Sequence, residues 1–117
     1  DVGGSWIITR RAGPGAAKEV FLTNRPFGAA ECRALGLVDQ VYPDHELHDK
    51  ARALAQQLAQ GPRQALARIK KLIEAAQHHG LHAHFDMERE SMLASGVTED
   101  AREGIRAFLE KRPPKFL

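Results

Sequence analysis

The sequence predicts a mainly helical chain, because two observations favour helices and only one short segment favours a strand. Apolar residues recur every three or four positions through most of the second half, as they do along one face of an amphipathic helix. Glycine and proline residues, among them Gly61 and Pro62, divide this half into segments of helix length. Apolar and polar residues alternate convincingly only over residues 37–42.

Two helices are predicted near the start of the chain. We expect Ser5 to cap the first helix, over residues 5–11, because a serine hydroxyl can accept a hydrogen bond from a free backbone N–H group. Gly13 and Pro14 should break this helix. Pro14 then suits the first position of a second helix that runs to about Leu22, because proline is tolerated where the N–H group has no helical partner.

A third short helix and the strand are predicted next. The helix is expected over residues 29–35, with Gly36 in the left-handed position that often follows a helix. The strand over residues 37–42 would leave its backbone groups unpaired unless a sheet from elsewhere received it. Because the sequence also begins in a glycine-rich turn without a methionine, we expect the chain to be part of a longer protein.

Four longer helices are predicted from residue 44 onward. Asp44 should cap the first of them, and Pro62 should open the second. The third is expected over residues 81–94, and the last should be capped by Thr98 and stopped by Pro113. The periodicity places the following residues on buried faces: Leu47, Leu54, Leu58, Leu66, Ile69, Leu72, Ile73, Phe85, Met92, Ile105, Phe108 and Leu109.

The composition bounds the class of protein. The 117 residues carry a formal net charge of +2 and are 43% hydrophobic, which fits one small domain and gives no sign of nucleic-acid binding. No apolar run approaches the ~20 residues that cross a bilayer, so no membrane association is expected. Cys32 is the single cysteine, which excludes an intrachain disulfide, favours the reducing cytoplasm and suits a buried packing position.

Neither the histidines nor the acids of the second half predict a catalytic centre. Six histidines are present, but no cysteine or pair of carboxylates completes a tetrahedral ligand set, so we expect solvated histidines and no metal. Glu88 and Glu90 point apart on a helix, and Glu88 is expected to be partly buried. No nucleophile triad, phosphate-binding loop or dinucleotide fingerprint occurs.

Four segments resemble, in order and spacing, the C-terminal part of the crotonase superfamily, the enoyl-CoA hydratase/isomerase family. The resemblance covers nearly the whole chain, and its last segment is long and specific. The segments are DVGGSW at residues 1–6, LTNR and AAE within residues 22–31, LGLVDQV at residues 35–41, and TEDAREGIRAFLEKR at residues 98–112.

The resemblance implies an α/β crotonase fold of the spiral type, of which this chain supplies a mainly α portion. Residues 1–43 would be the end of the crotonase core, with an active-site turn, short helices and one strand. Residues 44–117 would form a helical trimerisation region, which implies a homotrimer or a dimer of trimers.

The resemblance also implies chemistry on acyl-CoA thioesters. Family members polarise the thioester carbonyl with two backbone N–H groups and stabilise the resulting enolate. Those donors, and the two glutamates of the hydratases, would lie upstream of Asp1. Isomerases that shift a double bond, and an aryl-CoA dehalogenase, place an aspartate where Asp1 stands, so Asp1 is the candidate catalytic residue. Isomerisation is favoured, with hydration and dehalogenation as alternatives.

The same resemblance implies a set of substrate-binding residues and no cofactor beyond the coenzyme A of the substrate. Gly3, Gly4 and Trp6 would lie near the substrate, Phe108 against the adenine and Lys111 near a CoA phosphate. The isolated 117 residues would lack an oxyanion hole and should show no turnover. The alternative from another class is an inactive helical oligomerisation module.

Overall fold

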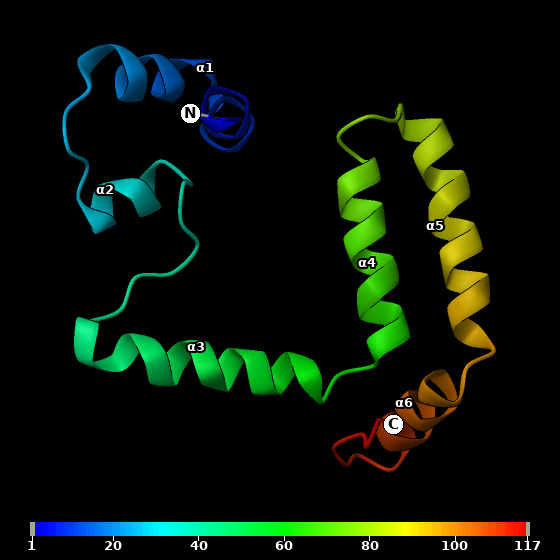
Figure 1. Cartoon of the computed structure of the whole chain (residues 1–117). Helices are drawn as coiled ribbons and strands as arrows, with labels where there is room; N and C mark the ends of the chain where they lie inside the picture. The colour runs from blue at the N-terminus through cyan, green and yellow to red at the C-terminus, as the bar shows by residue number, and fades with distance from the viewer. Residues whose placement is uncertain (1, 117) are drawn as a thin grey trace. The chain divides into compact units, whose positions relative to one another are not determined.

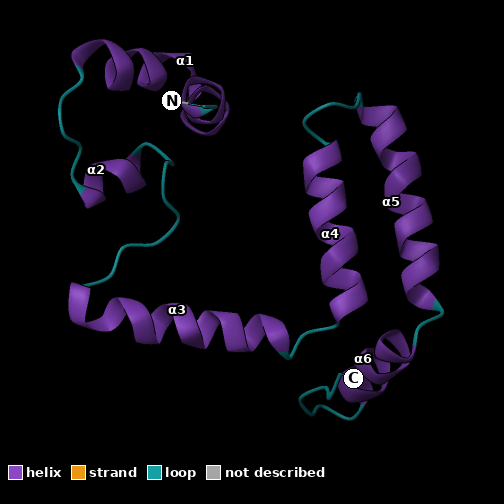
Figure 2. Ribbon diagram, viewed as in Figure 1, coloured by secondary structure: helices purple, strands orange, loops and turns teal. Residues whose placement is uncertain are grey.

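The structure, a computed structural model, describes residues 2–116, in which α-helices are joined by loops (Figures 1 and 2). No strand occurs in that range, so the mainly helical prediction is confirmed. The chain divides within α3 into two compact units, Asp1–Ala51 and Arg52–Leu117. The helices are α1 Gly4–Thr23, α2 Ala29–Ala34, α3 Asp44–Ala59, α4 Arg63–Ala75, α5 Leu81–Gly96 and α6 Glu99–Leu109.

Helix α1 consists of two arms joined at Gly13, as predicted from the glycine and proline there. Gly13 has φ 82° and ψ 166°, a conformation that is not helical and that side chains with a β-carbon rarely adopt. The predicted cap at Ser5 is wrong. Gly3, with φ 92°, is the residue before the helix, and Ser5 lies inside the first turn. Glycine reaches this left-handed conformation without a steric cost, which starts the helix ahead of the serine.

Gly36 ends the α2 turn as predicted, whereas the strand predicted over residues 37–42 is wrong. Gly36 has φ 74°, its N–H group donates to Arg33 O, and the next N–H group donates to Cys32 O. These two bonds define a Schellman motif. Arg11 then holds the loop after α2 in place, because it donates to Gly36 O at 3.1 Å and to Asp39 Oδ1 at 2.9 Å. A strand needs a neighbouring strand, and residues 2–116 offer none.

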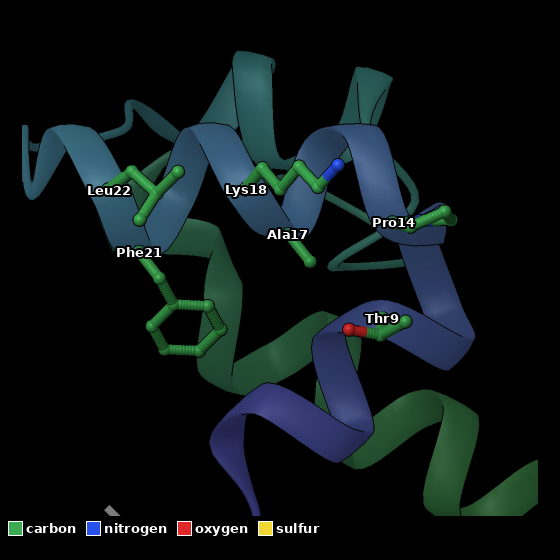
Figure 3. A pocket seen from close by; sticks show the side chains of 6 residues that line it. All are labelled: Thr9, Pro14, Ala17, Lys18, Phe21 and Leu22. Atoms are coloured by element: carbon green, nitrogen blue, oxygen red, sulfur yellow. The ribbon is translucent and has the colours of Figure 1, made fainter.

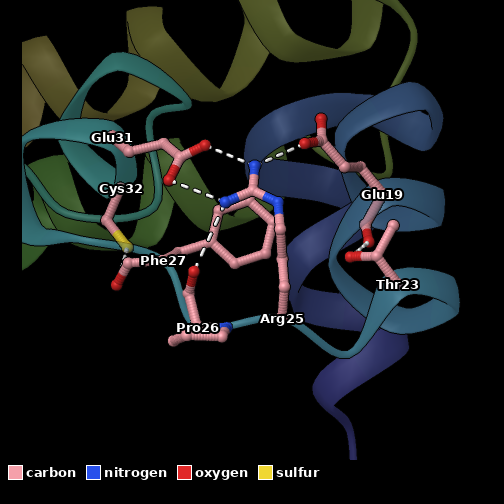
Figure 4. A network of polar contacts seen from close by, with 7 residues as sticks. All are labelled: Glu19, Thr23, Arg25, Pro26, Phe27, Glu31 and Cys32. Atoms are coloured by element: carbon pink, nitrogen blue, oxygen red, sulfur yellow. Dashed lines mark hydrogen bonds and ion pairs between the residues drawn. The ribbon is translucent and has the colours of Figure 1, made fainter.

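Arg25 joins the end of α1 to α2 (Figure 4). Its guanidinium group reaches Glu19 at 2.5 Å and Glu31 at 2.5 and 3.0 Å, and lies 3.8 Å from the centre of the Phe27 ring. The hydrogen bonds from Arg25 to Glu31 hold the pKa of the Glu31 carboxyl below its ordinary value. Cys32 beside them is half-buried rather than fully buried, with its Sγ atom 3.9 Å from Phe27 O.

In the second unit α4 packs against α5, and α5 contacts α6. Arg68 on α4 donates to Ser95 on α5 at 3.2 Å. Thr98 caps α6 as predicted, because its hydroxyl oxygen accepts from Ala101 N at 3.2 Å. Two other helix starts differ from prediction by one residue. Pro62 stands before α4 rather than at its first position, and Asp44 lies inside α3.

The burial predicted for these faces is wrong for most of their residues in this chain by itself, although Leu66 and Leu72 are half-buried. Ala17 and Ala107 are the buried hydrophobic residues of the described chain. Most large apolar residues of the predicted faces are exposed, because the helices do not cover one another's stripes. Periodicity identifies a surface that favours burial, but it does not identify what covers that surface. The exposed residues include Leu47, Leu54, Leu58, Ile69, Ile73, Phe85, Met92, Ile105, Phe108 and Leu109.

None of the helices in residues 2–116 combines the length and the apolar character that crossing a bilayer requires.

Candidate functional site

The first candidate site is the N-terminal end of α1. The first helical bond of this end runs from Ile7 N to Gly3 O at 2.9 Å, and no side chain caps the helix. The N–H groups of the preceding turn therefore have no partner within the helix. Asp1, the predicted catalytic residue, lies outside the described residues. In the sequence it stands two positions before Gly3.

Of the two predicted substrate-binding glycines, Gly3 has a local structural role. Gly3 is required because the chain is left-handed there. A β-carbon at Gly4 would lie 3.5 Å from Phe21 Cζ, an ordinary van der Waals contact, so the packing of the two arms of α1 does not require glycine there. The substrate contact predicted for each glycine remains a prediction.

Trp6 lies one turn further along and is 54% exposed. The guanidinium carbon of Arg10 lies 4.2 Å from the centre of its ring, in the geometry of a cation–π contact. One face of the indole is thus covered by a cation. The contact of Trp6 with substrate remains a prediction.

An apolar pocket of about 420 Å³, open to solvent, lies at the bend of α1 (Figure 3). Thr9 comes from the first arm and the other lining residues come from the second. This pocket was not predicted from the sequence, although its lining residues recur every three or four positions along the second arm, which is the signal of one helix face. None of the predicted site residues lines it. The lining residues are Thr9, Pro14, Ala17, Lys18, Phe21 and Leu22.

The structure brings Phe108 and Lys111 together at the end of α6. Phe108 is 83% exposed, so its ring is available for contact. Lys111 has φ 52°, and its N–H group donates to Phe108 O at 3.2 Å. Arg112 N donates to Ala107 O at 3.0 Å, which completes a Schellman motif with lysine in the position that glycine usually occupies.

Glu103 holds the residues that follow this turn. Its carboxylate accepts from Arg112 Nη1 at 2.6 Å, from Arg112 Nη2 at 3.1 Å and from Lys115 N at 2.9 Å. These bonds, chiefly those from the guanidinium group, lower the pKa of Glu103 to about 2. Arg112 also reaches Glu110 at 2.6 Å. The turn that carries Lys111 is therefore tied to α6 by charged groups on both sides.

A sequence model of the family described as enoyl-CoA hydratase/isomerase matches residues 1–117. The chain belongs to the enoyl-CoA hydratase/isomerase family. This membership confirms the resemblance to the crotonase superfamily. The chain is similar to a probable enoyl-CoA hydratase of Rhodobacter capsulatus, with 38% identity over 99% of this chain and 45% of that protein.

Two further relatives extend the comparison. The chain is 37% identical to 1,2-epoxyphenylacetyl-CoA isomerase of Escherichia coli, over 99% of this chain and 44% of that protein. It matches a crystal structure of enoyl-CoA hydratase from Bacillus anthracis with a TM-score of 0.91 and 35% identity, over 97% of this chain and 44% of that one. The chain thus spans less than half the length of these relatives.

In residues 2–116, no three or more histidine, cysteine, aspartate or glutamate side chains are grouped so that they could hold a metal ion. One histidine nevertheless differs from the prediction of solvated side chains. His84 is 15% exposed in its side chain, and its buried Nδ1 atom has no hydrogen-bond partner. Glu88, predicted to be partly buried, has a side chain that is 54% exposed. The better-buried positions of α5 are His84, Met87, Ser91 and Ser95, and Glu88 lies beside that stripe.

Proposed function

We propose that the chain is the C-terminal part of an acyl-CoA isomerase that shifts a double bond by way of a stabilised enolate. Two observations carry this proposal: the family match spans residues 1–117, and an aspartate stands two positions before Gly3, the residue that precedes α1. The similarity to 1,2-epoxyphenylacetyl-CoA isomerase of Escherichia coli supports isomerisation of a CoA thioester as the class of reaction. Hydration of a 2-enoyl-CoA is the main alternative, since other relatives are named as hydratases.

In this proposal Asp1 is the proton carrier. An enolate formed at the thioester can be protonated at either end of the allylic system, and a single carboxylate can remove the proton from one carbon and return it to the other. The two N–H donors that stabilise the enolate oxygen would come from polypeptide upstream of Asp1. Gly3, Gly4 and Trp6 would contribute to the wall beside the reacting carbons.

The end of α6 would bind the nucleotide part of coenzyme A. The exposed ring of Phe108 offers a stacking surface for an adenine, and Lys111 offers a positive charge to a phosphate. No carboxylate among residues 2–116 forms an ion pair with the Lys111 ammonium group, so its charge is not neutralised by a neighbour.

The reaction itself is tested by product analysis of the full protein. We expect conversion of a 3-enoyl-CoA to its 2-enoyl isomer, without net addition of water. Mass spectrometry and ultraviolet absorbance of the conjugated thioester measure this conversion. A 3-hydroxyacyl-CoA formed from a 2-enoyl-CoA as the main product would favour hydration, and halide release from a haloaryl-CoA would favour dehalogenation.

We also propose that residues 44–117 are an oligomerisation region. The apolar side chains of Leu54, Leu58, Ile69 and Ile73 are each about half exposed or more, which is the exposure expected of residues that other polypeptide covers. The expected mass of the full protein in light scattering is that of three or six copies. A single copy at micromolar concentration would contradict this proposal and leave the proposed reaction untouched.

A further inference from the structure

Glu103 lies outside every site predicted from the sequence, but its contacts reach the turn in which Lys111 adopts a left-handed conformation. A residue with a β-carbon is disfavoured at φ 52°, because its β-carbon approaches the following carbonyl oxygen. The same chain ends α2 with the same pair of backbone bonds, but there the left-handed residue is Gly36. Lysine at the second motif therefore keeps a conformation that its own backbone does not favour.

The contacts around the turn stabilise Lys111 in this disfavoured conformation. Arg112 directly follows Lys111, and its guanidinium group meets the Glu103 carboxylate with two bonds, in the bidentate geometry that fixes orientation as well as distance. The same carboxylate accepts from Lys115 N, so the tail is held on the same side of α6. The side chain of Glu103, inside α6, is 18% exposed, and that of its partner Arg112 is 34% exposed.

The contacts also determine which charge remains available. Glu103 and Glu110 are both within reach of the turn, and either could otherwise neutralise a lysine there. Arg112 bonds to both carboxylates, at 2.6 Å in each case. The Lys111 ammonium group consequently has no ion-pair partner among residues 2–116.

We propose that Glu103 is a positioning residue, which through Arg112 holds Lys111 in its left-handed turn and keeps its ammonium group free for a phosphate of the acyl-CoA substrate. This inference rests on the proposed function, because it requires that Lys111 meets a CoA phosphate. It adds a residue that does not itself touch the ligand.

The test is a double-mutant cycle in the full protein, with coenzyme A as the probe and calorimetry as the measurement. Lys111→Ala should weaken CoA binding about fivefold, the effect of an exposed ion pair. Glu103→Gln should weaken it about two- to threefold on the same scale, and should have no further effect when Lys111 is already alanine. Both variants should raise KM for the acyl-CoA and leave kcat near the wild-type value.

Glu99→Gln is the matched control, because Glu99 is also an acid of α6 that pairs with an arginine, Arg102, but it has no bond to the turn. It should leave CoA affinity unchanged. Lys111→Gly tests whether weaker CoA binding comes from loss of the lysine side chain or from loss of protein stability. It should raise the unfolding midpoint, since the left-handed conformation suits glycine, and still weaken CoA binding. Should Glu103→Gln fail to fold, Arg112→Lys, which loses the bidentate geometry, replaces it in the cycle.

Several outcomes would overturn the inference. Unchanged CoA affinity in a folded Glu103→Gln protein would do so, and so would an equal loss of affinity in the presence and absence of Lys111. In both cases a weakened Lys111→Ala variant would leave the proposed function standing. If the wild-type protein does not bind coenzyme A, both the inference and the proposed function are wrong.

Discussion

Asp1→Asn is expected to lower kcat for double-bond isomerisation about 10²- to 10⁴-fold, the range typical of losing a positioned acid or base. Asparagine has nearly the size of aspartate but cannot take up and return a proton. Because the amide keeps the volume of the side chain, the affinity for coenzyme A should stay close to that of the wild type. Steady-state rates on a 3-enoyl-CoA, measured over a range of substrate concentrations, give kcat and KM separately.

Asp39→Asn is the control for this substitution. Asp39 is an aspartate of the same unit whose side chain is 86% exposed and is held by Arg11, and it has no assigned role in the reaction. Its replacement should leave kcat within about twofold, because exposed ion pairs contribute little. An Asp1→Asn protein that keeps half of its isomerisation rate would contradict the role of Asp1. Loss of isomerisation with hydration retained would assign Asp1 to isomerisation alone and place a second acid upstream.

The features of the fold that could be predicted from the sequence depend on residues close together in the chain. The break in α1 follows from a glycine and a proline in succession, and the end of α2 follows from one glycine after a helical segment. The Thr98 cap needs only a hydroxyl and an N–H group three residues apart. In each case the determining atoms lie within about one helical turn, so no tertiary information is needed.

The features that could not be predicted depend on residues far apart. Alternation over residues 37–42 is compatible with a strand, but a strand forms only when another strand supplies hydrogen bonds. The carboxylate of Asp39 instead meets Arg11, 28 positions earlier in the sequence. The apolar stripes likewise indicate helix faces that favour burial, but other described residues cover little of these faces.

The candidate site shows the same division. The proximity of Phe108 and Lys111 follows from their short separation in the chain, because the residues are three positions apart at the end of α6 and Lys111 N donates to Phe108 O. The contact between Glu103 and Arg112 does not, since nine positions along a continuous helix would not bring these side chains together. It forms because Lys111 turns left-handed and returns the chain toward α6. A lysine in that conformation has no distinctive sequence signature, unlike a glycine.

Gly13→Ala is expected to lower the free energy of unfolding of the full protein by about 1–3 kcal/mol, the cost of holding a residue with a β-carbon in a region that is essentially restricted to glycine. Gly13 has φ 82° and ψ 166°. An added β-carbon would meet no other heavy atom within 4 Å, so crowding does not contribute to the expected loss. Chemical unfolding monitored by circular dichroism measures the change.

Gly15→Ala is the matched control, two residues away in the second arm of α1. There too a β-carbon would meet nothing within 4 Å, but the backbone lies in a helix and has no positive φ. Alanine should therefore raise the free energy of unfolding by about 0.5–1 kcal/mol, since glycine is the weaker helix former. The two substitutions add the same methyl group to open space, so opposite signs can only arise from the backbone conformation. Equal effects would mean that the bend, and with it the pocket between its arms, does not depend on the left-handed glycine.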